Sequence, residues 1–184
     1  MQPSMRHPLE AIPVGRRRRA FLPLFALTLV LMAALGSVDR PLRTAAVPHG
    51  IVSFEMAGDP ATAARMIDSW DPHARLFAAF SLGLDYLFMV AYSTTNALGC
   101  LWAAGVFRRA VPGLARLGPG LAWGQWLAAG LDAGENVALT VMLLGQVAEP
   151  WPAAAWWCAV PKFVLIAAGL LYALAAAVVR LGRR

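Results

Sequence analysis

The sequence is poor in charge, and this scarcity sets its class. Charged residues make up 14% of the 184 residues and hydrophobic residues 59%, whereas soluble domains carry about 25% charged residues. The mean hydropathy is +0.59. A chain of this composition is too apolar for an ordinary soluble domain, so we expect an integral membrane protein.

Cysteine and histidine are also scarce. The two cysteines, Cys100 and Cys158, fall near opposite faces of the expected membrane and do not suggest a disulfide framework. None of the three histidines lies in an apolar stretch. This argues against haem ligation between helices and against a histidine-rich iron site. We therefore expect no cofactor and no metal.

Four long apolar stretches are present instead, over residues 20–38, 76–107, 121–148 and 153–179. Each reaches the roughly 17–25 residues that a helix needs to cross a bilayer. Lipid offers no partner for backbone groups, so these spans must be helical. The expected fold is all-α, a polytopic membrane four-helix bundle. It forms a single domain over residues 20–184, after a disordered basic N-terminus over residues 1–19.

The arginines gather at three borders of these spans. They precede the first span, lie between the second and third, and follow the fourth: Arg6, Arg16, Arg17, Arg18, Arg19; Arg108, Arg109, Arg116; Arg180, Arg183, Arg184. The positive-inside rule then places both termini and the 108–120 loop in the cytoplasm. These arginines are not mixed with aromatic residues on one face, which argues against a nucleic-acid partner. The high arginine and alanine content is typical of a GC-rich bacterial source, so we expect a multi-pass protein of the bacterial inner membrane.

The first span has two interpretations. Residues 15–22 read GRRRRAFL, and residues 34–36 resemble a signal-peptidase site. The apolar run through Val38 nevertheless just suffices to cross a membrane, which favours an uncleaved first helix. Cleavage would leave three spans with unchanged orientation.

The loop over residues 39–75 is too long to be a plain connector. Residues 50–57 form a short, apolar, β-prone run. Asp59-Pro60 and Asp71-Pro72 then each place a capping acid before a proline, which predicts two helix starts. The first predicts a short amphipathic helix on the outer membrane surface, with Trp70 at headgroup depth.

Four ionisable residues interrupt the apolar spans: Asp85, Asp132, Glu135 and Lys162, which is the only lysine. An acid or lysine near mid-membrane costs roughly 2.5–3.5 kcal/mol. Such side chains must therefore face other helices or water. Helical spacing gathers them into polar stripes, with Tyr92 following Asp85 on the second span.

Counting inward from the span borders places most of these side chains at one depth, with Asp132 a turn nearer the cytoplasm. We expect Lys162 to pair with Asp85 or Glu135. The predicted ligand-binding residues are Asp85, Tyr92, Asp132, Glu135, Asn136 and Lys162, with Glu55 as a lid contact from the outer loop. No catalytic residue is assigned.

Three runs carry a resemblance: Ser53 to Gly58, the LDYLF run from Leu84 to Phe88, and the LDAGEN run from Leu131 to Asn136. Together they resemble an uncharacterised family of small bacterial membrane proteins, over roughly residues 50–175. The resemblance implies a four-helix integral membrane protein and no particular activity.

The expected function is the binding of a small molecule, ion or lipid in an acidic polar cavity within the membrane. Three acids against one lysine favour this, because a purely structural clamp does not need surplus charge. One alternative is an intramembrane enzyme that modifies a lipid or isoprenoid with carboxylate acid/base chemistry. A second is an accessory or assembly subunit of a membrane complex. Partners beyond the lipid bilayer, including a second copy or another membrane protein, stay open.

Overall fold

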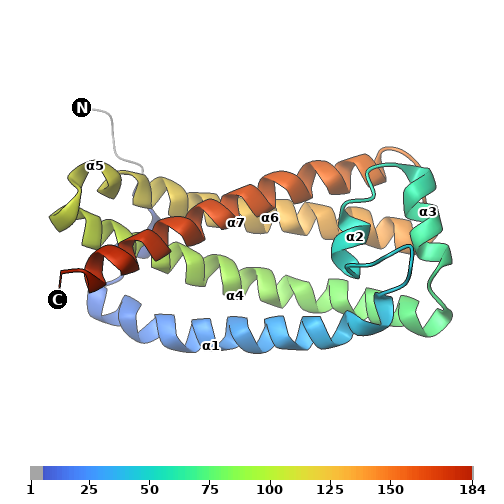
Figure 1. Ribbon diagram of the computed structural model, residues 1–184, viewed down its shortest axis with the longest axis horizontal. Helices are drawn as coiled ribbons and strands as arrows, with labels where there is room; N and C mark the ends of the chain where they lie inside the picture. The colour runs from blue at the N-terminus through green and yellow to red at the C-terminus, as the bar shows by residue number, and fades with distance from the viewer. Residues whose placement is uncertain (1–5, 184) are drawn as a thin grey trace. The chain divides into compact units, whose positions relative to one another are not determined.

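The computed structural model describes residues 6–183, and every regular element in this range is helical. The all-α prediction is therefore confirmed. Figure 1 shows the elements: η1 (Pro8–Ala11), α1 (Val14–Val38), η2 (Arg40–Leu42), α2 (Ile51–Glu55), α3 (Pro60–Asp68), α4 (Pro72–Ala110), α5 (Pro112–Ala115), α6 (Leu117–Leu143) and α7 (Trp151–Leu181).

Three helical segments of residues 6–183 are long and apolar enough to cross a membrane: Val14–Leu42, Pro72–Ala110 and Trp151–Leu181. Their most apolar stretches have mean hydropathies of 2.3, 1.5 and 2.3. Only 6% of that stretch is buried in the first segment, which leaves its apolar side chains free to contact lipid. Helix α6 is long enough at 27 residues but is not among the three, so the span predicted over residues 121–148 is not shown, and neither is the total of four spans.

The described residues form two compact units. Unit 1 comprises residues 6–28, 91–129 and 163–183, and unit 2 comprises residues 29–90 and 130–162. Each of the four long helices contributes a segment to each unit. The hydrophobic core of unit 1 gathers around Cys100, Phe107 and Tyr172.

The core of unit 2 joins the long helices to the two short ones. Phe54 of α2 and Ile67 of α3 are buried together with Leu82 of α4 and Leu139 of α6. Trp70 is 2% exposed and donates its indole N–H to the Leu42 carbonyl oxygen at 2.8 Å. The apolar face of α3 therefore covers this core. Trp70 thus packs inside the protein rather than on its surface, and the prediction that it lies at headgroup depth stays a prediction.

Both predicted helix starts are confirmed. The Asp59 carboxylate accepts the Thr62 N–H at 2.9 Å at the start of α3, and the Asp71 carboxylate accepts the Ala74 N–H at 2.7 Å at the start of α4. The β-prone run over residues 50–57 instead contains helix α2. A run this short needs a partner strand to become β structure, and residues 6–183 contain none.

The N-terminal segment also differs from the expectation of disorder over residues 1–19, of which residues 1–5 lie outside the described part. His7 caps η1, and helix α1 already begins at Val14. His7 is 1% exposed, with its ring 4.9 Å from the Trp123 ring and 4.4 Å from the Trp126 ring. Burial of the His7 ring thus fixes the position of a segment whose apolar residues show no helical periodicity.

Acidification should loosen this segment. Burial lowers the pKa of His7 below its ordinary 6.5, although Glu10 partly opposes the shift. Between the lowered value and 6.5 the undocked segment binds more protons, so docking is fully stable above about pH 6.5 and weakens as the pH falls through that window. Hydrogen exchange of the Glu10 and Ile12 amides, corrected for intrinsic rates, should be faster at pH 5 than at pH 8. A His7→Gln variant should lack this pH dependence, and equal protection at both pH values in the wild type would contradict the prediction.

Candidate functional site

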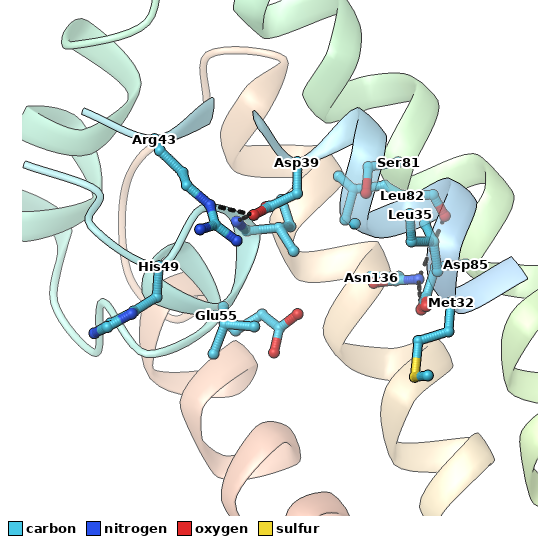
Figure 2. Close-up of a pocket in the computed structure, with 13 residues that line it drawn as sticks. Met32, Leu35, Asp39, Arg43, His49, Glu55, Ser81, Leu82, Asp85 and Asn136 are labelled. Atoms are coloured by element: carbon cyan, nitrogen blue, oxygen red, sulfur yellow. Dashed lines mark hydrogen bonds and ion pairs between the residues drawn. The ribbon is translucent and has the colours of Figure 1, made fainter. Parts of the chain in front are cut away.

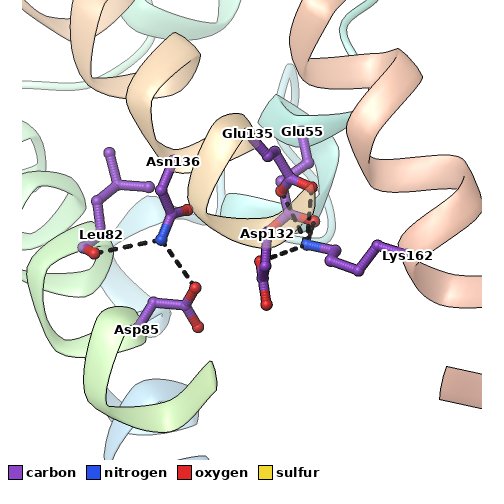
Figure 3. Close-up of polar contacts among 7 residues, drawn as sticks. All are labelled: Glu55, Leu82, Asp85, Asp132, Glu135, Asn136 and Lys162. Atoms are coloured by element: carbon purple, nitrogen blue, oxygen red, sulfur yellow. Dashed lines mark hydrogen bonds and ion pairs between the residues drawn. The ribbon is translucent and has the colours of Figure 1, made fainter. Parts of the chain in front are cut away.

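The ammonium group of Lys162 lies among three carboxylates in unit 2 (Figure 3). Its Nζ is 2.9 Å from Asp132 Oδ1, 2.9 Å from Glu135 Oε1 and 2.8 Å from Glu135 Oε2. Glu55 Oε2 lies 3.5 Å from the same nitrogen. Helices α2, α6 and α7 thus meet at one cation, and we refer to these four residues as the Lys162 cluster.

Helical spacing explains the two contributions from α6. Asp132 and Glu135 are three residues apart, so their side chains lie on one face of the helix. Nearby, a Cβ at Gly134 would meet the Cys158 sulfur at 3.5 Å, which is ordinary contact. Helices α6 and α7 therefore pack side by side here, and the contact leaves room for a side chain as large as that of alanine.

Glu55 reaches the cluster because the loop before α2 is fixed. The Asp39 carboxylate accepts the Ile51 N–H at 2.7 Å and so satisfies the first turn of α2. Gly50 precedes this turn with φ 58°, a conformation that favours glycine. A Cβ there would collide with the Asp39 carboxylate. The turn at Gly50 therefore sets the direction of α2 and the place of Glu55 at its end.

The cluster combines deep burial with an excess of negative charge. The side chains of Lys162 and Glu135 are 4% and 0% exposed. One ammonium against three carboxylates leaves surplus negative charge that is costly in a medium of low dielectric constant. Burial raises the pKa of Glu55 above its ordinary value, although Lys162 acts in the opposite direction. A proton on Glu55 reduces the surplus.

Asp85 and Asn136 form a second polar pair in unit 2 (Figure 3). Asn136 Nδ2 donates to Asp85 Oδ2 at 2.8 Å and also to the Leu82 carbonyl oxygen at 3.4 Å. Within residues 6–183, Asp85 forms no salt bridge. Its carboxylate is therefore held by a neutral donor rather than by a cation.

A pocket of about 270 Å³ in unit 2 is lined by residues of both the Lys162 cluster and the Asp85–Asn136 pair (Figure 2). Glu55, Asp85 and Asn136 line it, so the pocket touches both the Lys162 cluster and the second pair. The remaining lining residues come from α1, the loop after it, α2 and α4: Met32, Leu35, Gly36, Asp39, Arg43, His49, Ile51, Val52, Ser81 and Leu82.

The arginine in this pocket already has a partner. Arg43 Nε lies 3.1 Å from Asp39 Oδ2 in a salt bridge. Asp39, Arg43 and His49 were missed in the sequence. The only signal was that Asp39 follows the first apolar stretch, where a charged residue is ordinary.

The structure brings together six of the seven predicted site residues. Glu55, Asp132, Glu135 and Lys162 form the cluster, and Asp85 pairs with Asn136 rather than with Lys162. Asp132, expected a turn nearer the cytoplasm, reaches the same ammonium as Glu135, which lies three residues further along α6. Tyr92 is buried but belongs to unit 1. That the site binds a ligand stays a prediction.

Within the described part of the chain, no three His, Cys, Asp or Glu side chains are grouped so as to hold a metal ion. In the Lys162 cluster, the ammonium occupies the place between the carboxylates.

No family model, no curated protein and no solved structure matches this chain. The resemblance described above therefore rests on its three motifs alone.

Removal of the ammonium should be strongly destabilising. A Lys162→Met variant keeps an aliphatic side chain of similar length but leaves the carboxylates without their cation. We expect a loss of about 3–5 kcal/mol in the free energy of unfolding. Chemical unfolding in detergent measures it, and an Arg40→Met variant provides the control because Arg40 is exposed. A Lys162→Met protein as stable as the control would show that the cluster contributes nothing net.

Stability should also carry a pH dependence that comes from Glu55. A carboxyl whose pKa is raised on folding binds more protons in the folded state than in the unfolded state. The stabilisation that Glu55 contributes is therefore present at low pH and is lost as the pH rises above 4.5, the ordinary pKa of a glutamate. Between pH 5 and pH 8, the free energy of unfolding of a Glu55→Gln variant should fall less than that of the wild type. Glu149→Gln, which changes an exposed acid, should retain the wild-type slope. Identical slopes in all three proteins would contradict the assignment.

Proposed function

We propose that the protein is a four-span membrane protein that binds a small organic cation, an amine with an apolar body, in the pocket of unit 2. The proposal rests on the environment of Asp85. It is an acid on the pocket wall that forms no salt bridge with any of residues 6–183.

The charges around the pocket favour a cation over an anion. The arginine that lines the pocket and the lysine behind Glu55 are both paired: Arg43 with Asp39, and Lys162 with the cluster carboxylates. Asp85 is held only by the neutral amide of Asn136. An incoming ammonium group would therefore find an acceptor, whereas an anion would meet Asp85 and the negative cluster behind Glu55.

The shape and lining of the pocket favour a small amphiphile. Its volume of about 270 Å³ lies just below the roughly 300–1,000 Å³ typical of ligand pockets. Met32, Leu35 and Val52 provide apolar surface, while Ser81 offers a hydroxyl group. This combination suits a short hydrocarbon chain that ends in an amine.

The proposed fourth span is α6. It contains the polar residues Gln125, Asp132, Glu135 and Asn136, and all four are buried within their own units. These side chains therefore do not face lipid, and the rest of the helix is apolar enough to do so. With four spans, the arginine-rich borders favour an orientation in a bacterial inner membrane in which both termini lie in the cytoplasm.

Butylammonium is a suitable probe, with butanol as its neutral counterpart. Purified protein in a neutral detergent should bind butylammonium in isothermal titration calorimetry and should not bind butanol. An Asp85→Asn variant should bind butylammonium about 10–100-fold more weakly, because a charge-assisted hydrogen bond contributes roughly 1.5–3 kcal/mol.

Asp68→Asn is the matched control, because Asp68 is an exposed acid in the same unit whose one ion pair within residues 6–183, with Arg75, is long at 3.7 Å. It should bind like the wild type. If Asp85→Asn binds the probe normally, or if butanol binds equally well, the proposal fails. If Asp85→Asn only lowers the amount of folded protein, the acid has a structural role.

A further inference from the structure

Unit 1 contains a second and larger pocket of about 1490 Å³. Its lining is strongly basic, with seven arginines against a single acid, Glu10. The arginines come from the N-terminal segment, α1, the end of α4 and the end of α7: Arg6, Arg17, Arg18, Arg108, Arg109, Arg180 and Arg183. Nothing in the proposed function of unit 2 uses this pocket.

Several of these guanidinium groups are available to a ligand. Arg17 and Arg183 donate to backbone carbonyl groups and so help to hold the pocket together. Arg18, Arg108 and Arg109 are exposed, and their side chains make no hydrogen bond or salt bridge with residues 6–183. A guanidinium group matches the geometry of a phosphate with two parallel hydrogen bonds.

Most of the remaining lining is apolar, and on α1 and α4 large apolar residues lie on one side of the arginines. On α4 the apolar residues from Leu98 to Val106 come first, and Arg108 and Arg109 follow. On α1 the order is reversed, with Arg17 and Arg18 before the apolar Phe21 and Leu22, although Val14 precedes both arginines. The large apolar side chains beyond the arginines are Phe21, Leu22, Leu98, Leu101, Trp102 and Val106. The stretch from Leu98 to Arg109 rises about 16 Å along the helix. Both helices thus present an apolar wall that ends in a basic rim.

Trp102 joins the two parts of this wall. Its ring is 37% exposed, and the Arg180 guanidinium carbon lies 5.8 Å from the ring centroid, within the range of a cation–π interaction. Tryptophan and arginine side by side are typical of the level at which lipid headgroups meet acyl chains.

We propose that this pocket of unit 1 binds an anionic phospholipid. The phosphate contacts Arg18, Arg108 and Arg109, and an acyl chain lies along Leu22 and Trp102. Charge complementarity identifies the headgroup as anionic, and the apolar wall requires a hydrocarbon chain attached to it. Basic pockets between membrane helices bind acidic headgroups in this way. A soluble phosphate would leave the apolar wall uncovered.

Trp102 supplies the readout of the test. Phosphatidylglycerol with brominated acyl chains, titrated into the full-length protein in neutral detergent, should quench tryptophan fluorescence saturably. Phosphatidylcholine with the same brominated chains should require a much higher concentration. A Trp102→Phe variant should lose the saturable part of the signal. Inorganic phosphate should not compete with the lipid at comparable concentration.

Substitutions of the arginines test whether the basic rim binds the lipid phosphate. Arg108→Gln combined with Arg109→Gln should weaken binding on the order of 25-fold, about fivefold for each arginine. Arg18→Gln alone should weaken it by about fivefold and provides a second measurement if the double variant is poorly folded. Arg16→Gln with Arg116→Gln changes the net charge equally at exposed positions outside the pocket, and it should bind as the wild type does.

Three results would overturn the proposal. Equal quenching by phosphatidylcholine would remove the role of charge. Equal weakening by the Arg16 and Arg116 control would mean a diffuse electrostatic effect rather than a pocket. Full competition by inorganic phosphate would mean a simple anion site in which the acyl chain has no part.

Discussion

One buried ammonium group sets the architecture of unit 2. A charge removed from water is tolerated only when other charges and hydrogen bonds surround it. Lys162 obtains three carboxylates from two other elements, α2 and α6. Helices α2, α6 and α7 therefore cannot shift independently without exposing an unpaired charge to an apolar medium. The packing of α2, a helix of only five residues, depends on this electrostatic constraint as much as on its apolar contacts.

The two pockets have opposite electrostatic character. In the pocket of unit 2 the acids exceed the cations, and all but the half-buried Asp85 are buried, which suits a small ligand that replaces its water shell by fixed groups. In unit 1 the arginines exceed the acids and are exposed at the rim, which suits a ligand that remains partly in the lipid headgroup region. Both follow from the same rule: a polar group near hydrocarbon persists only where a partner is available.

The sequence predicted the long helices and most of the candidate site, because both depend on local patterns. Apolar length marks a span, and polar residues at helical spacing must share a face. It did not predict the pocket wall formed by Asp39 and Arg43, or the helix at residues 51–55. These depend on how a connecting segment folds back after the first span, where the direction is set by the left-handed turn at Gly50 and by tertiary contacts. Composition and periodicity do not encode such contacts.

Lys162 is the only lysine in the chain. Every side-chain amine that a reagent could acylate therefore belongs to one buried position. Its reactivity reports on the opening of unit 2 without any engineered label: acylation proceeds only when the carboxylates release the ammonium and solvent enters. The rate of acylation at Lys162 therefore measures how often unit 2 opens to solvent.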